Sequence, residues 1–125
     1  MATTLSNYIG PSDVTVLCYK KDNFKEQIAK DYKIDSNKIE TIKTNETLEE
    51  LLKEYYGNDK KIIPALLYHI NNTLKEVKNI YKPNNYLIEK LSGSENKYCV
   101  FYTVEDIFIV ESNNYMYLFV LGNFE

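Results

Sequence analysis

The sequence contains no arginine: all 15 of its basic residues are lysine, and it has one histidine and no tryptophan. Its four glycines are isolated from one another. Without arginine there is no guanidinium to bind a carboxylate, a phosphate or a guanine through two parallel hydrogen bonds. Isolated glycines exclude the glycine-rich loop that binds nucleotide phosphates. These absences argue against an enzyme, although sites built from carboxylates and tyrosines leave little trace in one sequence.

The sequence is also poor in metal-binding and nucleophilic residues. Cys18 and Cys99 lie inside apolar, strand-like runs, where a cysteine usually behaves as a small buried hydrophobic residue. Either could pair with His69 as a thiolate and an imidazole, but no nucleophile signature surrounds them. Two cysteines do not make a disulfide framework, and one histidine with two distant cysteines does not supply the four ligands of a zinc site. We therefore predict no metal and no cofactor.

Long apolar runs are missing as well. No stretch approaches the roughly 20 apolar residues of a membrane-spanning helix, and the start, MATTLSNYIGPSD, lacks the basic and apolar regions of a signal peptide. We expect a cytoplasmic protein that does not enter a membrane. The 14 asparagines and 12 tyrosines, together with many lysines and isoleucines, are typical of an A/T-rich bacterial or viral genome. Such a bias supplies tyrosines without any selection for binding.

The net charge of −3 is located at the end of the chain. Residues 1–96 contain 14 lysines and 14 acidic residues, whereas residues 97–125 contain one lysine and four acidic residues. Nucleic-acid binding through this last part is disfavoured, because it requires a basic surface. Three of the four acids, Glu105, Asp106 and Glu111, form an acidic cluster in the predicted sheet. They form either a solvated turn with a strand-end charge or a pair of carboxylates suited to a divalent metal or to acid–base chemistry.

The pattern of elements predicts one α+β domain, residues 1–125. Residues 1–13 read as a polar lead, and residues 14–44 as a β-α-β-like unit. Residues 47–92 are predicted to be helical, and residues 97–122 to form antiparallel strands. We expect the C-terminal hairpin or meander to join one sheet with helices over one of its faces.

Two helices have clear local signals. Thr47 and Glu50 fit a capping box, and Gly57 fits the residue that ends the same helix. The next helix is predicted to run to Pro83, because apolar residues recur at steps of 4, 3, 4, 3 and 4. These residues are Ile63, Leu67, Ile70, Leu74, Val77 and Tyr81. The seam is shorter than a coiled coil needs, so a core helix lying on the sheet is favoured, with a dimer seam as the alternative.

The last strands are apolar on both faces. Residues 107–121 are predicted to form a hairpin around Ser112-Asn113-Asn114, since asparagine tolerates the positive φ of such turns. Glu105-Asp106 is predicted to be a turn or a bulge. A sheet with two apolar faces has to be covered on both, by the protein's own helices or by a second molecule.

Four tyrosines of these strands can share one sheet face if the register permits: Tyr98, Tyr102, Tyr115 and Tyr117. Tyrosine is enriched in contact surfaces because it buries a large area and keeps a hydroxyl for a partner. One interpretation is a core face beneath the helices. The other is a partner-binding surface made of these tyrosines with Glu105, Asp106 and Glu111.

The leading functional hypothesis is a small acidic protein–protein interaction module. An immunity-type protein or an inhibitor encoded by a phage or mobile element fits this description, and an acidic surface with tyrosines suits a basic protein partner. A second hypothesis is a small-molecule-binding protein or minor enzyme with a pocket between the sheet and the long helix, lined by Cys18, Tyr68, His69 and Cys99. A third is a structural homo-oligomer, such as a homodimer formed through an edge strand or the helical seam.

Overall fold

The computed structural model describes residues 2–4, 13–57, 62–74, 76–94 and 101–124 of the chain. The strands in these ranges are β1 (Ala2–Thr4), β2 (Asp13–Lys20), β3 (Thr41–Thr44), β4 (Asn79–Pro83), β5 (Phe101–Glu111) and β6 (Tyr115–Phe124). The α-helices are α1 (Phe24–Tyr32), α2 (Leu48–Tyr56), α3 (Ile62–Leu74) and α4 (Asn85–Leu91). Two short 3-10 helices, η2 (Lys21–Asn23) and η3 (Ser36–Lys38), flank α1. Within the described ranges, no helix has the length and apolar character needed to cross a membrane.

The described strands form one sheet in the order β1-β2-β6-β5-β4-β3. Every neighbouring pair is antiparallel, and the predicted α+β class is confirmed. The predicted strand near residues 39–44 is present as β3, but it lies at the opposite side of the sheet from β2. The polar lead is not wholly irregular, because β1 pairs with β2 at the other edge.

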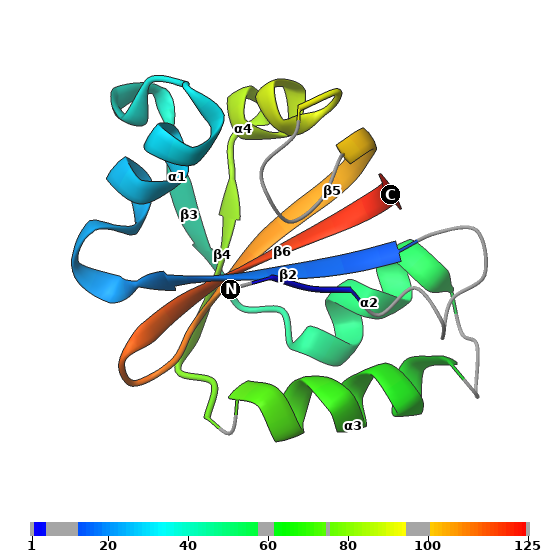
Figure 1. The fold of residues 1–125 in the computed structure, drawn as a ribbon. Coiled ribbons are helices and arrows are strands. Elements are labelled where there is room, and N and C mark those ends of the chain that lie inside the picture. The colour runs from blue at the N-terminus through cyan, green and yellow to red at the C-terminus, as the bar shows by residue number, and fades with distance from the viewer. Residues whose placement is uncertain (1, 5–12, 58–61, 75, 95–100, 125) are drawn as a thin grey trace.

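Helices cover both faces of this sheet, so the prediction that they cover one face is wrong (Figure 1). Strand β6 explains why, because its alternate residues point to opposite faces. Tyr117 and Phe119 pack with α2 and α3, whereas Met116 and Leu118 pack with α1 and α4. The ring of Phe119 stacks on Phe108 of β5, with centroids 4.8 Å apart, at the centre of the α2–α3 side. Two helical layers therefore bury the apolar faces that the sequence left open.

Helix α2 begins where the sequence predicts. The Thr47 hydroxyl accepts the Glu50 N–H at 3.2 Å, and the Glu50 carboxylate accepts the Thr47 N–H at 3.2 Å. These reciprocal bonds satisfy two of the donors that a helix N-terminus leaves open. Gly57 follows the helix with a φ of +72°.

The helix predicted to reach Pro83 ends at Leu74, so the prediction that residues 47–92 are helical is wrong at β4. Strand β4 lies between β3 and β5, with Ile80 opposite Val110 and Tyr81 opposite Ile109. The buried side chain of Ile80 joins the α2–α3 core from the sheet. β-Branched and aromatic residues favour such a half-buried, pleated position, and pairing with two neighbours outweighs the helical spacing.

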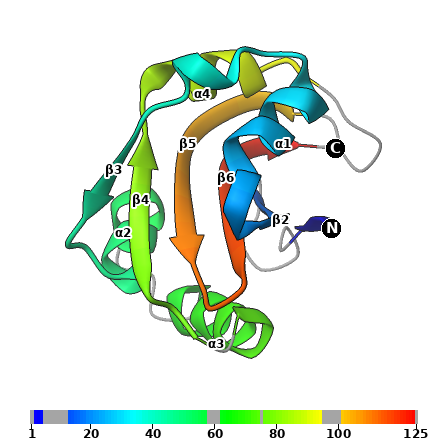
Figure 2. The same ribbon diagram turned by 90° about the vertical axis from the view of Figure 1, so that its left-hand side faces the viewer.

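The predicted hairpin is confirmed, and so is the irregularity at Glu105-Asp106. Ser112 N–H donates to the Tyr115 carbonyl at 2.9 Å and closes the turn. The register of β5 against β6 shifts between Val104 and Asp106, which is a β-bulge. Bulges bend a strand and increase its twist, and Figure 2 shows β5 curving along its length. Gly122 permits the close approach here, because a Cβ on it would lie 2.0 Å from the Thr103 oxygen.

Candidate functional site

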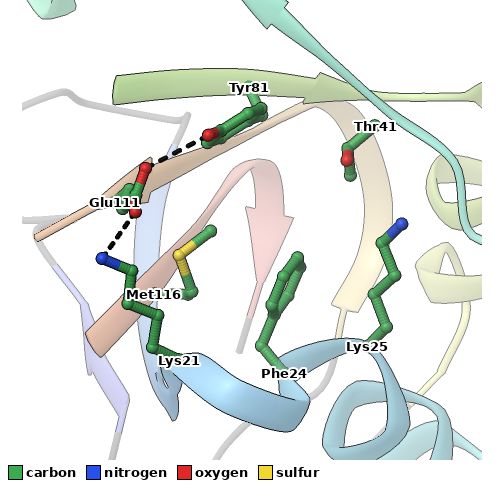
Figure 3. A pocket seen from close by; sticks show the side chains of 7 residues that line it. All are labelled: Lys21, Phe24, Lys25, Thr41, Tyr81, Glu111 and Met116. Atoms are coloured by element: carbon green, nitrogen blue, oxygen red, sulfur yellow. Dashed lines mark hydrogen bonds and ion pairs between the residues drawn. The ribbon is translucent and has the colours of Figure 1, made fainter. Parts of the chain in front are cut away.

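A cavity of about 300 Å³ opens on the α1–α4 side of the sheet. Its lining comes from six elements, η2, α1, β3, β4, β5 and β6. The lining residues are Lys21, Phe24, Lys25, Thr41, Tyr81, Glu111 and Met116 (Figure 3). Figure 3 shows Phe24 and Met116 between two polar ends, with Lys21 and Glu111 at one end and Lys25 and Thr41 at the other.

The cavity exists because the two helices on this side cover only part of the sheet. Helix α1 contacts β2, and α4 contacts β4 and β5. Figure 2 shows both helices toward the same end of the curved sheet, with the β5–β6 turn at the other end. The cavity lies between the start of α1 and the strands that curve away from it, so residues distant in sequence meet around it.

The Glu111 side chain, at one end of the cavity, makes an ion pair and two further hydrogen bonds. Its Oε2 atom lies 2.6 Å from Lys21 Nζ, and its Oε1 atom accepts hydrogen bonds from Asn79 Nδ2 at 2.9 Å and Tyr81 Oη at 3.1 Å. Lys21 also donates to the Ser112 carbonyl at 3.3 Å. The Glu111 side chain is 14% exposed, so these partners replace most of its water.

These contacts determine the charge states of Glu111 and Tyr81 at neutral pH. The hydrogen bond from Lys21, followed by that from Asn79, lowers the pKa of Glu111 from 4.5 to about 2. Burial raises the pKa of Tyr81, with its bond to Glu111 as a second cause. At neutral pH Glu111 is therefore a carboxylate that accepts, and the Tyr81 hydroxyl donates to it.

The other end of the cavity contains Lys25, for which the described residues supply no ion-pair partner. Lys25 is half-buried, and no ion pair joins it to an acid in the part of the chain that the structure describes. Its side chain extends from α1 toward the strand that bears Thr41 (Figure 3). Between the two ends, Met116 is buried and Phe24 is half-buried, and both pack against the α1–α4 core. The cavity thus combines an apolar wall with one lysine that has no described partner.

The predicted partner surface is divided by the structure. Tyr117 is 7% exposed beneath α2 and α3, whereas Tyr115 is 44% exposed near the hairpin turn. Their rings remain close, with centroids 6.3 Å apart. Glu111 lies opposite Met116, which packs on the α1–α4 side, so it faces away from Tyr117.

The remaining members of that surface are not gathered beside these residues. Glu105 is exposed and Asp106 is half-buried, and both sit at the bulge, six residues and five residues before Glu111 on β5. Tyr98 lies outside the described residues, and only the backbone of Tyr102 is described. The described members therefore do not form one continuous surface.

Of the pocket predicted between the sheet and the long helix, the structure describes the side chains of Cys18 and Tyr68. Leu66, Ile70 and Leu74 of α3 pack with sheet residues in the same core. Cys18 is half-buried against this core, and burial raises its thiol pKa. Tyr68 is 66% exposed on α3.

The two other members of that predicted pocket cannot be placed in it. Cys99 lies outside the described residues, and for His69 only the backbone in α3 is described. Cys18 and Tyr68 do not line the cavity beside Glu111. A raised thiol pKa also means less thiolate at neutral pH, which makes Cys18 a poorer nucleophile.

Most cavity residues were not candidates on sequence grounds. From the sequence alone, the doublet Lys20-Lys21 is typical of solvated charges, and Phe24 shares one apolar helix stripe with Ile28 and Tyr32. Glu111 was a candidate, but for a different surface. The one usable signal was Met116 and Glu111 flanking a tight turn, which places an acid and a flexible apolar side chain opposite each other in a hairpin.

Two further hollows lie near β3. The larger one, of about 420 Å³ beside the start of α2, is lined mainly by exposed residues. A hollow of about 300 Å³ on the outer edge surrounds Ile42, which is 76% exposed. Neither contains an ion pair as closely held as Lys21 and Glu111, so the cavity beside Glu111 is the better candidate.

Among the described residues, no group of three or more histidine, cysteine or acidic side chains is arranged to hold a metal ion. Compared with models of protein families, with curated proteins and with solved structures, the chain matches none. A functional proposal therefore rests on the residues of the cavity.

Proposed function

We propose that this protein binds a small organic molecule in the cavity between α1 and the open end of the sheet. The observation that supports the proposal is an apolar wall, Phe24 and Met116, between two polar ends, one of which is fixed. Binding sites for small molecules are usually concave and mostly apolar, with a few placed polar groups. A volume of about 300 Å³ is at the small end of such sites and suits a ligand of one ring.

The fixed end also supports binding, because it limits the rearrangement that a ligand would require. Lys21 of η2 and Asn79 and Tyr81 of β4 all contact Glu111 of β5. Three elements are thus joined at one carboxylate. A polar end whose side chains are already ordered loses less conformational entropy on binding than an end whose side chains are mobile.

The test uses two tryptophan variants of neighbouring residues on β3. Thr41 lines the cavity, whereas Ile42 is 76% exposed and lines the hollow on the outer edge. A set of one-ring fragments is screened by thermal unfolding. A fragment at tenfold its Kd is expected to raise the Tm by about 5 °C. Thr41→Trp should remove this shift by filling the cavity, and Ile42→Trp should retain it.

Two results would count against ligand binding in this cavity. One is a fragment set that leaves the wild-type Tm unchanged at millimolar concentrations. The other is a shift that survives in the Thr41→Trp variant, which would place the bound fragment elsewhere. The Ile42→Trp variant shows whether a tryptophan on this short strand is tolerated at all.

A second candidate function is the occupation of a partner protein. One observation favours it: Tyr115 remains 44% exposed beside the hairpin turn, with the exposed Glu76 hydrogen-bonded to Asn113 close by. The net charge of −3 would favour a basic partner. Tyr115→Ala should then weaken partner capture while the protein stays folded. Light scattering separates this from self-association, since a dimer that dissociates in the Tyr115→Ala variant would make the second copy the partner.

A further inference from the structure

We propose that the ligand of the cavity carries an anionic group, a carboxylate or a phosphate, and that the Lys25 amino group binds it. This inference rests on the function proposed above, because it concerns the same cavity. It follows from the way in which the three charges that line the cavity are paired.

Two of the three charges already neutralise each other. Lys21 Nζ lies 2.6 Å from Glu111 Oε2 and also donates to the Ser112 carbonyl. The Glu111 carboxylate accepts two more hydrogen bonds, from Asn79 and Tyr81. A cationic ligand would have to displace donors from Glu111, so the cavity disfavours a cation.

The third charge, on Lys25, has no described ion-pair partner. It is half-buried at the edge of an apolar wall, where an opposite charge is screened less than on an open surface. The Lys25 side chain reaches toward Thr41 (Figure 3), whose hydroxyl can donate to the same anion. An ammonium group and a hydroxyl suit one carboxylate or phosphate without the paired geometry that arginine provides.

The apolar wall indicates the rest of the ligand. Phe24 offers a ring face or edge, and Met116 offers a flexible, polarizable side chain. Figure 3 shows these two side chains between the polar ends of the cavity. A planar, unsaturated ring with one acidic substituent matches this arrangement and the volume of about 300 Å³.

Three small aromatic probes, of which benzoate and benzamide have nearly the same shape, test the charge. Benzoate carries a carboxylate, phenyl phosphate carries a phosphate, and benzamide is the neutral counterpart of benzoate. We expect the wild-type protein to bind benzoate or phenyl phosphate about tenfold more tightly than benzamide at low salt, because one ion pair in a partly buried site is worth about that factor. The preference should decrease as salt is added.

Two lysine variants locate the effect. Lys25→Met keeps most of the apolar side chain and removes the charge, so it should bind the anion and benzamide equally. Lys30→Met is the matched control, since Lys30 is exposed on the same helix and does not line the cavity. It should keep the tenfold preference. Titration calorimetry with each probe, at equal pH and salt, measures the ratio.

The outcomes separate this inference from the proposed function. If none of the probes, nor any neutral fragment, binds in the cavity, the proposed function fails and the inference fails with it. If benzamide binds as tightly as benzoate and phenyl phosphate, the cavity binds ligands but the inference is wrong. If the anion preference survives in Lys25→Met, Lys25 is not the anion-binding residue and the inference is wrong. A preference for phenyl phosphate over benzoate identifies the anion as a phosphate, and the reverse identifies it as a carboxylate.

Discussion

The Nζ atom of Lys21, which follows strand β2, lies 2.6 Å from the Oε2 atom of Glu111 at the end of strand β5. The pair joins the segment that leads into α1 to the β5–β6 hairpin. It also forms one end of the cavity that we propose binds a ligand. The same contact therefore stabilises the fold and shapes the site, and both consequences can be measured.

The first prediction concerns Glu111 and pH. Its folded-state pKa of about 2 lies below its ordinary value of 4.5. A group whose pKa is lowered by folding stabilises the protein above the unfolded value, and this contribution is lost as the pH falls toward the folded value. Glu111→Gln should lower the free energy of unfolding by about 2 kcal/mol at pH 7, because it removes charge-assisted hydrogen bonds from a mostly buried group.

Urea unfolding at pH 7, 5 and 3 measures the difference in the free energy of unfolding between the wild-type protein and the Glu111→Gln variant. It should narrow between pH 4.5 and pH 3, as Glu111 of the unfolded wild-type protein becomes protonated. Glu105→Gln on the same strand is the control, since Glu105 is exposed and should change stability by less than about 0.5 kcal/mol. A difference for Glu111→Gln that stays constant over this range would rule out the linkage.

The second prediction is a stabilising substitution at Thr15. Its side-chain hydroxyl is fully buried in the sheet and has no hydrogen-bond partner among the described residues. Valine has nearly the same shape without the hydroxyl, so Thr15→Val should raise the free energy of unfolding by about 1 kcal/mol. Thr15→Ser, which keeps the hydroxyl and removes the methyl group, should lower it. A destabilised Thr15→Val protein would mean that the hydroxyl has a partner.

The third prediction concerns the close approach of β6 to the β5 bulge. A Cβ on Gly122 would lie 2.0 Å from the carbonyl oxygen of Thr103, so one of the two backbones would have to move. Gly122→Ala should therefore destabilise the protein by about 3 kcal/mol. Gly93→Ala provides the comparison, because Gly93 has open space but a φ of +77°, and it should cost about 1 kcal/mol. Equal losses of stability for Gly122→Ala and Gly93→Ala in thermal unfolding would contradict the close approach of β6 to Thr103 at the bulge.

The fourth prediction separates two neighbouring tyrosines. Tyr117 is 7% exposed in the α2–α3 core, so Tyr117→Ala should lower stability by about 3 kcal/mol. Tyr115 is 44% exposed, so Tyr115→Ala should cost less than about 1 kcal/mol. Chemical denaturation of the two single variants decides the point. Similar losses in both would show that Tyr115 is part of the core and not available to a partner.

Local signals made several elements predictable from the sequence. The capping box at Thr47 and Glu50 requires residues only three positions apart, and the turn at Ser112–Asn114 connects adjacent strands. The alternation of apolar residues in β6 indicated two buried faces. In each case the contacts that decide the structure are near neighbours in the chain or follow one period.

Strand β4 was not predictable from spacing, because Val77 and Tyr81 continue the helical steps of Ile70 and Leu74. A short apolar run fits both helix and strand periods. What decides the outcome is non-local: Ile80 pairs with Thr44 on one side and Val110 on the other. The local pattern of apolar residues does not determine the order of the strands. The two neighbours of β4 are β3, which precedes it by two helices, and β5, which follows it after α4.

The cavity was unpredictable for the same reason. Thr41 of β3 and Lys25 of α1 meet around it because β3 lies across the sheet from β2. Lys21 reads as a solvated charge until the hairpin places Glu111 beside it. Local sequence therefore predicts helices, turns and faces, whereas the candidate site depends on the order of the strands.

The most direct test of ligand binding in this cavity is a methyl NMR titration. The chain has two methionines, Met1 and Met116, and among the described residues it is Met116 that lines the cavity. With methyl-labelled methionine, the spectrum has two signals, which Met116→Leu assigns. Titration with benzoate, benzamide and benzyl alcohol should shift the Met116 signal saturably, with a Kd of about 1 mM for the best fragment. A Met116 signal that no fragment moves at millimolar concentration would contradict the proposed site.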